Sequence, residues 1–227
     1  MVTCVVDLVR PEVAEAAIRC LERTGARVDV PSRQTCCGQP AWNAGYTGEA
    51  RRVARHTLDV FGGDEPVVCL AGSCAAMIKV FYRELFEGRP EAVPAEALAH
   101  RTHEFSSFLE GGEVGRCGGT VAYHDSCHML RELSVKAEPR DVLRQAGTRV
   151  VDLGERCCGF GGTFSVKLPE ISAAMADEKL AEVRSGGADT VVGCDLSCLL
   201  HLEGRARRTG TAGRFLHLAE YLDGGTG

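Results

Sequence analysis

Leu21-Glu22-Arg23-Thr24-Gly25-Ala26-Arg27-Val28, followed by Cys36-Cys37-Gly38, is a stretch that occurs twice in this sequence. It returns as Leu143-Arg144-Gln145-Ala146-Gly147-Thr148-Arg149-Val150, followed by Cys157-Cys158-Gly159. Recurrence at matched spacing indicates two copies of one structural unit. We therefore expect two tandem, pseudo-symmetric repeats. The first half spans residues 1–112 and the second half residues 118–227, and they join near the glycines between 115 and 119.

Each half combines helical and strand patterns. Apolar residues recur at helical spacing in some segments, while other short runs are apolar throughout, as in buried strands. The expected helices are 11–24, 49–61 and 75–86 in the first half, and 141–145, 169–185 and 215–222 in the second. The expected strands are 27–30, 66–70, 150–153 and 190–192. Strands that alternate with helices predict an α/β fold, with a small, mainly parallel sheet and flanking helices in each half.

Composition and charge exclude several classes of protein. The 227 residues contain 26 Lys and Arg against 31 Asp and Glu, a net charge of −5. A mildly acidic chain lacks the basic stripe that binds nucleic acid or an anionic membrane surface. It also has neither the roughly 20 consecutive apolar residues of a membrane span nor a visible secretory signal. We expect a cytoplasmic protein.

The repeat sorts the 12 cysteines into ligands and bystanders. Eight of them have a counterpart in the other half, which gives two sets of four: Cys4, Cys36, Cys37 and Cys74, and then Cys127, Cys157, Cys158 and Cys198. Four have no counterpart, namely Cys20, Cys69, Cys117 and Cys194. Unmatched cysteines are expected to pack as small apolar residues. Cys194 precedes Cys198 by four positions and is the one candidate for an additional ligand.

Four thiolates satisfy either a tetrahedral zinc ion or an iron-sulfur cluster of the 4Fe-4S type. Structural zinc sites usually draw on cysteines two to four residues apart. Adjacent cysteines such as Cys36-Cys37 point apart in an extended loop and more easily serve different iron atoms. The pattern favours two iron-sulfur clusters, with zinc as the alternative.

Two histidines flank the first cysteine of the second half, in Tyr123-His124-Asp125-Ser126-Cys127-His128. His124 and His128 are candidates for metal ligation, for hydrogen bonds to sulfur, or for proton transfer coupled to catalysis. Capping of a strand end is the structural alternative. Asp125 is expected to fix an imidazole tautomer.

The order of these elements resembles a known family. One cysteine, about 30 residues, Cys-Cys-Gly, about 37 to 40 residues and a further cysteine resemble the cysteine-rich CCG domain, which occurs twice in the B subunit of heterodisulfide reductase. The stretches Thr35–Ala41, His124–His128 and Cys157–Lys167 resemble the lactate utilization branch of that family over essentially the whole chain.

The resemblance implies an electron-transfer subunit, without flavin, of an oxidoreductase complex that oxidises L-lactate. Its implied partners are a second iron-sulfur subunit and a third, smaller subunit. The heterodisulfide reductase subunit ends each repeat with Cys-x-x-Cys, whereas the last positions here are Met77 and His201. This difference favours four-ligand clusters over heterodisulfide-type thiol chemistry, which stays an alternative together with a zinc-stabilised scaffold. Relatives also carry apolar residues before the equivalent of Val2-Thr3-Cys4. Either a missing first strand weakens the Cys4 site, or the start of the sequence is misassigned.

Overall fold

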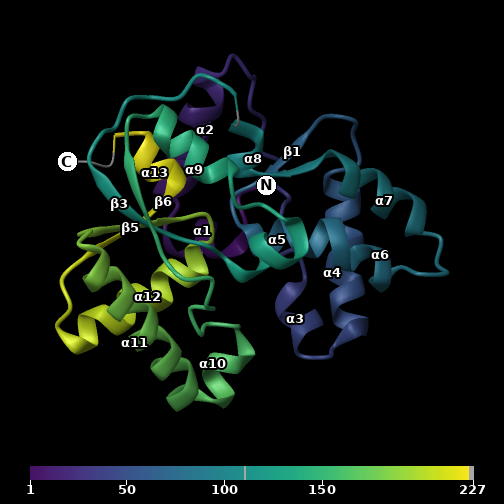
Figure 1. Cartoon of the computed structure of the whole chain (residues 1–227). Helices are drawn as coiled ribbons and strands as arrows, with labels where there is room; N and C mark the ends of the chain where they lie inside the picture. Colours follow the sequence, from purple (N-terminus) through teal and green to yellow (C-terminus); the bar gives the residue numbers. More distant parts are fainter. Residues whose placement is uncertain (110, 225–227) are drawn as a thin grey trace.

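The computed structural model describes residues 1–109 and 111–224, which form an α/β fold with two parallel sheets (Figure 1). The larger sheet belongs to the second half and has the strand order β4-β3-β5-β6. Its strands are β3 (Thr120–His124), β4 (Arg149–Asp152), β5 (Thr190–Gly193) and β6 (Arg214–His217). Because β3 pairs with β4 on one side and with β5 on the other, it is the central strand of the order 4-3-5-6. This confirms the predicted fold class.

Helices cover both faces of this sheet. The helices of the second half are η2 (Met129–Leu133), α9 (Glu138–Gln145), α10 (Thr163–Lys167), α11 (Pro169–Gly186), α12 (Leu196–Thr209) and α13 (Leu218–Leu222), where η denotes a π-helix. Ala122 of β3 packs with Leu180 and Leu199 of α11 and α12. Its neighbour Tyr123 points the other way, into the core that holds α9 and α13. Alternate residues of a strand face opposite sides of a sheet, so β3 is buried on both.

The first half has a smaller sheet. Two parallel strands, β1 (Val67–Cys69) and β2 (Thr102–Glu104), form it. The helices are α1 (Cys4–Val9), α2 (Glu12–Arg23), α3 (Gln39–Asn43), α4 (Thr47–Val60), α5 (Gly72–Ala76), η1 (Met77–Phe81), α6 (Tyr82–Leu85), α7 (Ala92–Arg101) and α8 (Phe105–Leu109). The run from α5 to α6 is continuous and corresponds to the single helix predicted over 75–86.

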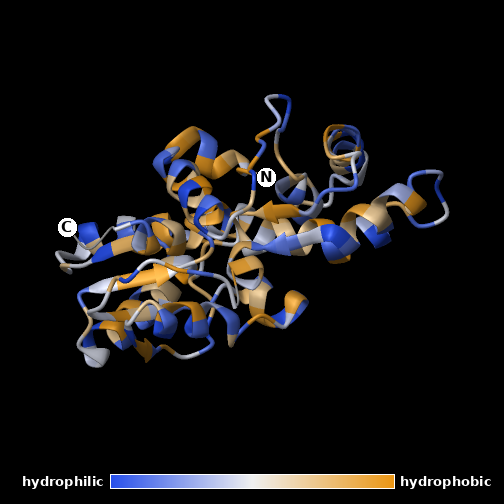
Figure 2. Cartoon of the chain, turned by 90° about the horizontal axis from the view of Figure 1, so that it is seen from above, coloured by the Kyte–Doolittle hydropathy of each residue, from blue (hydrophilic) through white to orange (hydrophobic). Residues whose placement is uncertain are grey.

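The two halves share a core. Helix α2 of the first half packs on α13 of the second, and η2 and α9 of the second half pack on α5 and α8 of the first. One cluster of buried residues therefore joins Val13 and Leu21 of α2 to Tyr123 of β3 and Leu222 of α13. In Figure 2 hydrophobic and hydrophilic residues alternate along the helices. Helices of each half pack against helices of the other half, so neither half buries its apolar residues alone.

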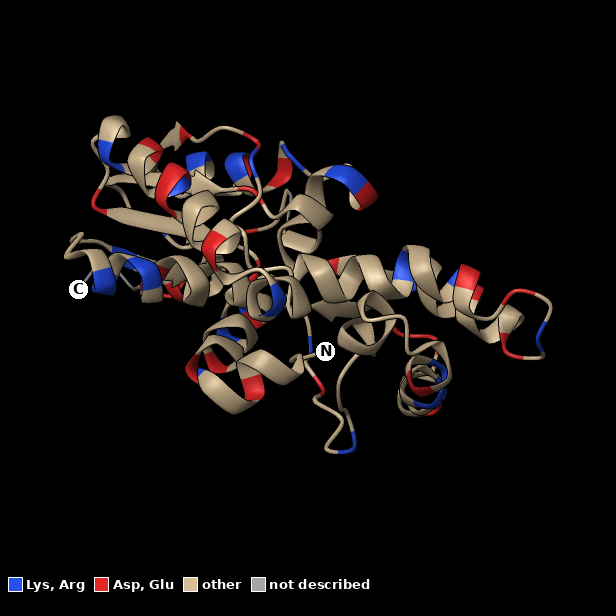
Figure 3. Ribbon diagram, turned by 90° about the horizontal axis from the view of Figure 1, so that it is seen from below, with Lys and Arg blue, Asp and Glu red and all other residues tan. Residues whose placement is uncertain are grey.

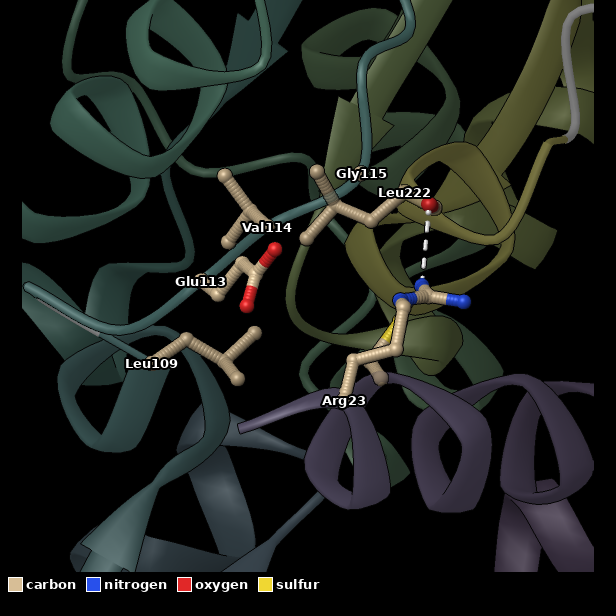
Figure 4. A pocket seen from close by; sticks show the side chains of 7 residues that line it. Arg23, Leu109, Glu113, Val114, Gly115 and Leu222 are labelled. Atoms are coloured by element: carbon tan, nitrogen blue, oxygen red, sulfur yellow. Dashed lines mark hydrogen bonds between the residues drawn. The ribbon is translucent and has the colours of Figure 1, made fainter. Parts of the chain in front are cut away.

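Polar contacts fasten the same junction. Arg23 at the end of α2 donates a hydrogen bond of 3.1 Å to the carbonyl oxygen of Leu222, beside Leu109 and Val114 (Figure 4). Its guanidinium also contacts Asp223 at 2.9 Å. At the other end of the shared core, Arg10 donates to Glu203 at 2.7 Å. Basic and acidic residues are otherwise mixed over the molecule (Figure 3). No helix within residues 1–109 and 111–224 is both long and apolar enough to span a bilayer.

Two of the predicted elements are wrong. The first part of the C-terminal segment 215–222 belongs to strand β6, because Phe215 and His217 are buried beside β5, and only Leu218–Leu222 is helical, as α13. The segment 27–30 is not a strand, since no strand pairs with it. In contrast, the helix expected over 11–24 is confirmed as α2 and ends before Gly25, whose φ of +86° favours glycine.

The unpaired segment 27–30 borders a groove. Its counterpart β4 pairs with β3, and in the first half Met1 lies at the position that corresponds to His124, the last residue of β3. The Met1 amino group donates to Val68 O at 2.6 Å, and Leu70 N donates to Met1 O at 3.3 Å. Met1 thus lies beside β1 as His124 lies beside β5. The groove between residues 27–31 and β1 has a volume of about 740 Å³.

Candidate metal centres

The cysteines of the first half converge on one site. Cys4 begins α1, Cys36 and Cys37 lie on the loop before α3, and Cys74 lies in α5. The Cys37 thiol donates to Cys74 Sγ at 3.3 Å, and Cys4 and Cys36 share a hydrogen bond. The backbone N–H of Gly38 donates to Cys36 Sγ at 3.4 Å. Four sequence-predicted residues from three separate segments thus meet.

The cysteines of the second half form a matching site. Cys127 follows β3, Cys157 and Cys158 lie on the loop between β4 and α10, and Cys198 lies in the first turn of α12. Cys157 shares hydrogen bonds with Cys127 and Cys158, and Cys158 with Cys198. The N–H of Gly159 donates to Cys157 Sγ at 3.4 Å, the same distance as in the first half. Both sites lie where strands end, the usual place for ligands in parallel α/β folds.

One cysteine in each site has a lowered pKa, so its surroundings favour the thiolate form. Hydrogen bonds from Cys37 and Cys4 lower the pKa of Cys36 to about 3. Bonds from Cys127 and Cys158 lower the pKa of Cys157 to about 2. The donating thiols have raised pKa values for the same reason, and burial adds to the effect. A soft cation that displaces these shared protons would find sulfur ligands already gathered.

Glycines shape both cysteine loops. Gly38 and Gly159 have φ values of +90° and +92°, a region in which a side chain is strained. At Gly159 a Cβ atom would also lie 2.6 Å from the carbonyl oxygen of Ser172. At Gly38 the nearest such atom is the Ala50 oxygen, at 3.2 Å. The turn is the same in both halves, but the second is more tightly packed.

A buried hydroxyl precedes the first cysteine of each site. Thr3, beside Cys4, is 3% exposed and Ser126, beside Cys127, is 1% exposed. Neither hydroxyl has a hydrogen-bond partner within the described part of the chain. Buried hydroxyls are rarely left without one. A thiolate or sulfide brought in with a metal would supply the missing acceptor, so the donor set and its surroundings fit a metal centre.

His124 lies at the second site. It is the last residue of β3, is 2% exposed, and has a ring nitrogen within 4.8 Å of both Cys158 Sγ and Cys198 Sγ. Burial lowers the pKa of His124 to about 4. Asp125 does not fix its tautomer as expected, since both carboxylate oxygens accept from Arg140 at 2.8 and 2.7 Å.

His128 lies on the opposite side of Cys127 and faces the first half. Its Nε2 is 3.3 Å from Gln39 Nε2, and its Nδ1 is 3.3 Å from Glu132 Oε2. The ring meets Phe81 edge-on, with 6.3 Å between centroids. Gln39 directly follows Cys36-Cys37-Gly38, so this histidine of the second half lies near the site of the first. The two predicted histidines are therefore not parts of one site.

The unmatched cysteines lie outside both sites. Cys20 donates to Ala219 O at the α2–α13 contact, and Cys117 donates to Tyr221 O at 3.2 Å. Cys69 is fully buried beside Met1. Cys194 accepts a hydrogen bond of 3.5 Å from Tyr123 and contacts Glu104, away from Cys198 and its partners. Their packing agrees with the expectation for bystanders.

Sequence analysis missed the polar residues that hold the sites in place. Arg140 is only 7% exposed, pairs with Asp125 and reaches Asp152 at 2.6 Å. Asp195 Oδ2 accepts from Ser73 N at 3.0 Å and so ties the second half to the residue before Cys74. The repeat contains no signal for these pairs, because neither has a counterpart in the other half.

Comparison with known proteins shows the family of the chain and its place within that family. The family model of the cysteine-rich CCG domain matches residues 1–79 and 121–203, and the chain belongs to this family. Within it, the chain belongs with the lactate utilization protein A sequences. It is 44% identical to Lactate utilization protein A of Geobacillus kaustophilus over 98% of this chain and 96% of the relative. The corresponding protein of Anoxybacillus flavithermus is 42% identical over 98% and 97%. These findings confirm the resemblance drawn from the sequence.

Proposed function

We propose that this protein is an iron-sulfur electron-transfer subunit of a complex that oxidises L-lactate in the cytoplasm. Each half would hold one cluster, the first through Cys4, Cys36, Cys37 and Cys74, and the second through Cys127, Cys157, Cys158 and Cys198. A bound cluster of the 4Fe-4S type supplies reversible one-electron transfer. The observation that carries the proposal is the convergence of each cysteine quartet, with no cysteine left over at either site.

The surroundings of the thiols support an electron-transfer role. The N–H groups of Gly38 and Gly159 donate to Cys36 and Cys157, and such bonds stabilise negative charge on sulfur and tune a cluster's potential. Cys37 and Cys158 are 1% and 2% exposed, so water is largely excluded from one side of each site. The name of the relatives supports lactate as the source of electrons. The proposed partners are a second iron-sulfur subunit and a third, smaller one.

Anaerobic quantification of iron and sulfide, with visible and electron paramagnetic resonance spectra, tests the proposal. We expect iron and sulfide in equal amounts in the native protein. The double change Cys36→Ser and Cys37→Ser, and the matching change Cys157→Ser and Cys158→Ser, should each remove about half of both. Cys20→Ser is the matched control outside the sites and should remove none. Anaerobically prepared protein without iron or sulfide would overturn the proposal.

Zinc is a second candidate because the thiols are close together. Cys37 Sγ and Cys74 Sγ are 3.3 Å apart, so a small outward shift would bring them to the roughly 3.8 Å that separates two sulfurs around a tetrahedral zinc ion with bonds of about 2.3 Å. In that case the sites would hold the two halves together without redox chemistry. Stoichiometric zinc in protein that has never met oxygen would favour this scaffold role.

A catalytic role makes a different prediction from electron transfer. Thiol or disulfide chemistry of the heterodisulfide reductase type, assisted by His124 or His128, requires one of these rings during turnover. The double change His124→Ala and His128→Ala should then abolish lactate oxidation by the assembled complex while iron content stays constant. Under the proposed electron-transfer role, turnover with His128→Ala stays close to that of the unmodified complex.

A further inference from the structure

The second site contains a nitrogen donor that the first site lacks. His124 ends the central strand β3 and lies opposite Gly193 of β5. Met1 holds the same place in the first half, between Val68 and Leu70, and offers a thioether 3.8 Å from Cys69 Sγ instead of an imidazole. The two sites share their thiols but differ at this one position.

The His124 ring has no other task in the fold. Neither Nδ1 nor Nε2 has a hydrogen-bond partner among the residues that the structure describes, although the side chain is nearly fully buried. An unpaired buried polar group destabilises a fold, and such groups are rare. Asp125, the adjacent acid, is fully engaged by Arg140. His217 at the end of strand β6 differs from His124, because both of its ring nitrogens take part in hydrogen bonds with the backbone.

The ring is also aimed at the site. One of its nitrogens and the sulfurs of Cys158 and Cys198 all lie within 4.8 Å of one another. Gly193 leaves room for the backbone of His124 on the paired strand, because a Cβ atom there would lie 3.1 Å from His124 O. Imidazole nitrogen and thiolate are compatible ligands for both iron and zinc.

We propose that a ring nitrogen of His124 binds the metal atom nearest to Cys158 and Cys198, so that the second site has mixed nitrogen and sulfur ligation while the first has sulfur alone. This inference rests on the proposed metal occupancy of the sites. It makes the two centres chemically distinct within one repeated fold. Nitrogen ligation in iron-sulfur proteins accompanies higher reduction potentials, so the second centre becomes the better electron acceptor of the two.

The test is nitrogen hyperfine coupling in the full chain labelled with ¹⁵N-histidine and reduced anaerobically. Pulsed electron paramagnetic resonance should show a strong ¹⁵N coupling on one of the two centres. The Cys36→Ser and Cys37→Ser double variant, which keeps only the second site, should retain this coupling. His124→Ala should lose it, and His124→Gln provides a second variant if alanine prevents folding. His128→Ala is the matched control and should retain it.

Each other outcome overturns the inference. Metal-loaded native protein without strong ¹⁵N coupling would show that ligation is by sulfur alone, and a coupling about tenfold weaker would indicate only a hydrogen bond to sulfur. Coupling that survives His124→Ala would assign the nitrogen to another histidine. If the metal is zinc, X-ray absorption of the same variants must show a nitrogen ligand that His124→Ala removes. Protein that binds no metal overturns both proposals, whereas metal without nitrogen overturns only this one.

Discussion

The two halves of the molecule hold the same cysteine quartet in differently built frames. In the second half, β3 fills the centre of a four-stranded sheet and is buried on both faces. In the first half the sheet has the two strands β1 and β2, and a groove of about 740 Å³ lies between residues 27–31 and β1. The cysteines converge in both halves nevertheless. The loops and helix starts that carry the thiols are therefore less dependent on the sheet than the repeated pattern suggests.

The largest expected difference concerns the ion pair that only the second half has. Asp125→Ala removes the buried, bidentate partner of the Arg140 guanidinium and leaves only the exposed Asp152 beside it. Breaking a buried pair from one side costs about 3–5 kcal/mol of unfolding free energy. The matched control is Asp141→Ala, which removes the exposed partner of Arg144 on the same helix and should cost about 0.5 kcal/mol or less. Urea denaturation of the metal-free variants measures both, and similar losses would contradict the assigned role of Asp125.

The next comparison uses the two glycines after the cysteine pairs. Both require a positive φ, which costs a side chain roughly 1–2 kcal/mol. Gly159→Ala additionally forces a Cβ against the Ser172 carbonyl, and overpacking adds about 1–3 kcal/mol. We expect a loss of roughly 3–4 kcal/mol for Gly159→Ala and roughly 1–2 kcal/mol for Gly38→Ala. Thermal unfolding under anaerobic conditions gives the ranking, and equal effects would show that the two loops are packed alike.

A third difference concerns the residues that cap the last helix of each half, which is α8 in the first half and α13 in the second. Glu104 caps α8 through Ser106 N at 2.9 Å, and burial raises its pKa to about 7. The folded state therefore holds a proton between pH 4.5 and 7 that the unfolded state releases, so the unfolding free energy falls as pH rises through this range. Replacement by glutamine keeps the cap and removes the titration. The Glu104→Gln variant should gain about 3 kcal/mol relative to the native chain between pH 4.5 and 8.

His217 caps α13 in the same way, but its contribution to the unfolding free energy changes with pH in the opposite direction. It accepts from Ala219 N at 3.1 Å, and burial lowers its pKa to about 4. The folded state here binds fewer protons, so the unfolding free energy falls as pH drops from 6.5 towards 4. His217→Asn should flatten the pH dependence of the unfolding free energy below pH 6.5 and leave its slope above pH 6.5 unchanged. If the native-minus-variant differences in unfolding free energy change with pH in the same direction for both substitutions, the contrast is contradicted.

The smallest expected effect comes from filling the groove. A chain extended before Met1 by Thr-Val-Ala-Tyr, the residues of β3 that precede His124, would place a strand between residues 27–30 and β1. It would also replace the buried Met1 amino group, whose pKa burial lowers, with a neutral amide. We expect a gain of about 1–2 kcal/mol, typical of a single stabilising change. A Thr-Pro-Ala-Pro extension cannot complete the ladder and is the control. Equal melting temperatures would show that the groove does not accept a strand.

Much of the architecture could be predicted because the repeat and the apolar periodicity are local features. They located helices such as α2 and α11 and strands such as β1 and β5 to within a few residues. The segment 27–30 failed, although its composition suits a strand. A strand forms only where a neighbour accepts its hydrogen bonds, and the sequence of one segment does not say whether that neighbour exists.

The sequence by itself determined the α/β class, the two matched quartets of cysteine and the four cysteines outside them, because these follow from spacing and from comparison of one half with the other. Only the tertiary structure decided that α2 crosses to the second half, that His124 and His128 belong to different sites, and that Asp125 serves Arg140. These facts depend on contacts between residues far apart in the chain. Such contacts are fixed by the packing of the whole core. A local sequence pattern shows only which face of one helix or strand is apolar, not what packs against it.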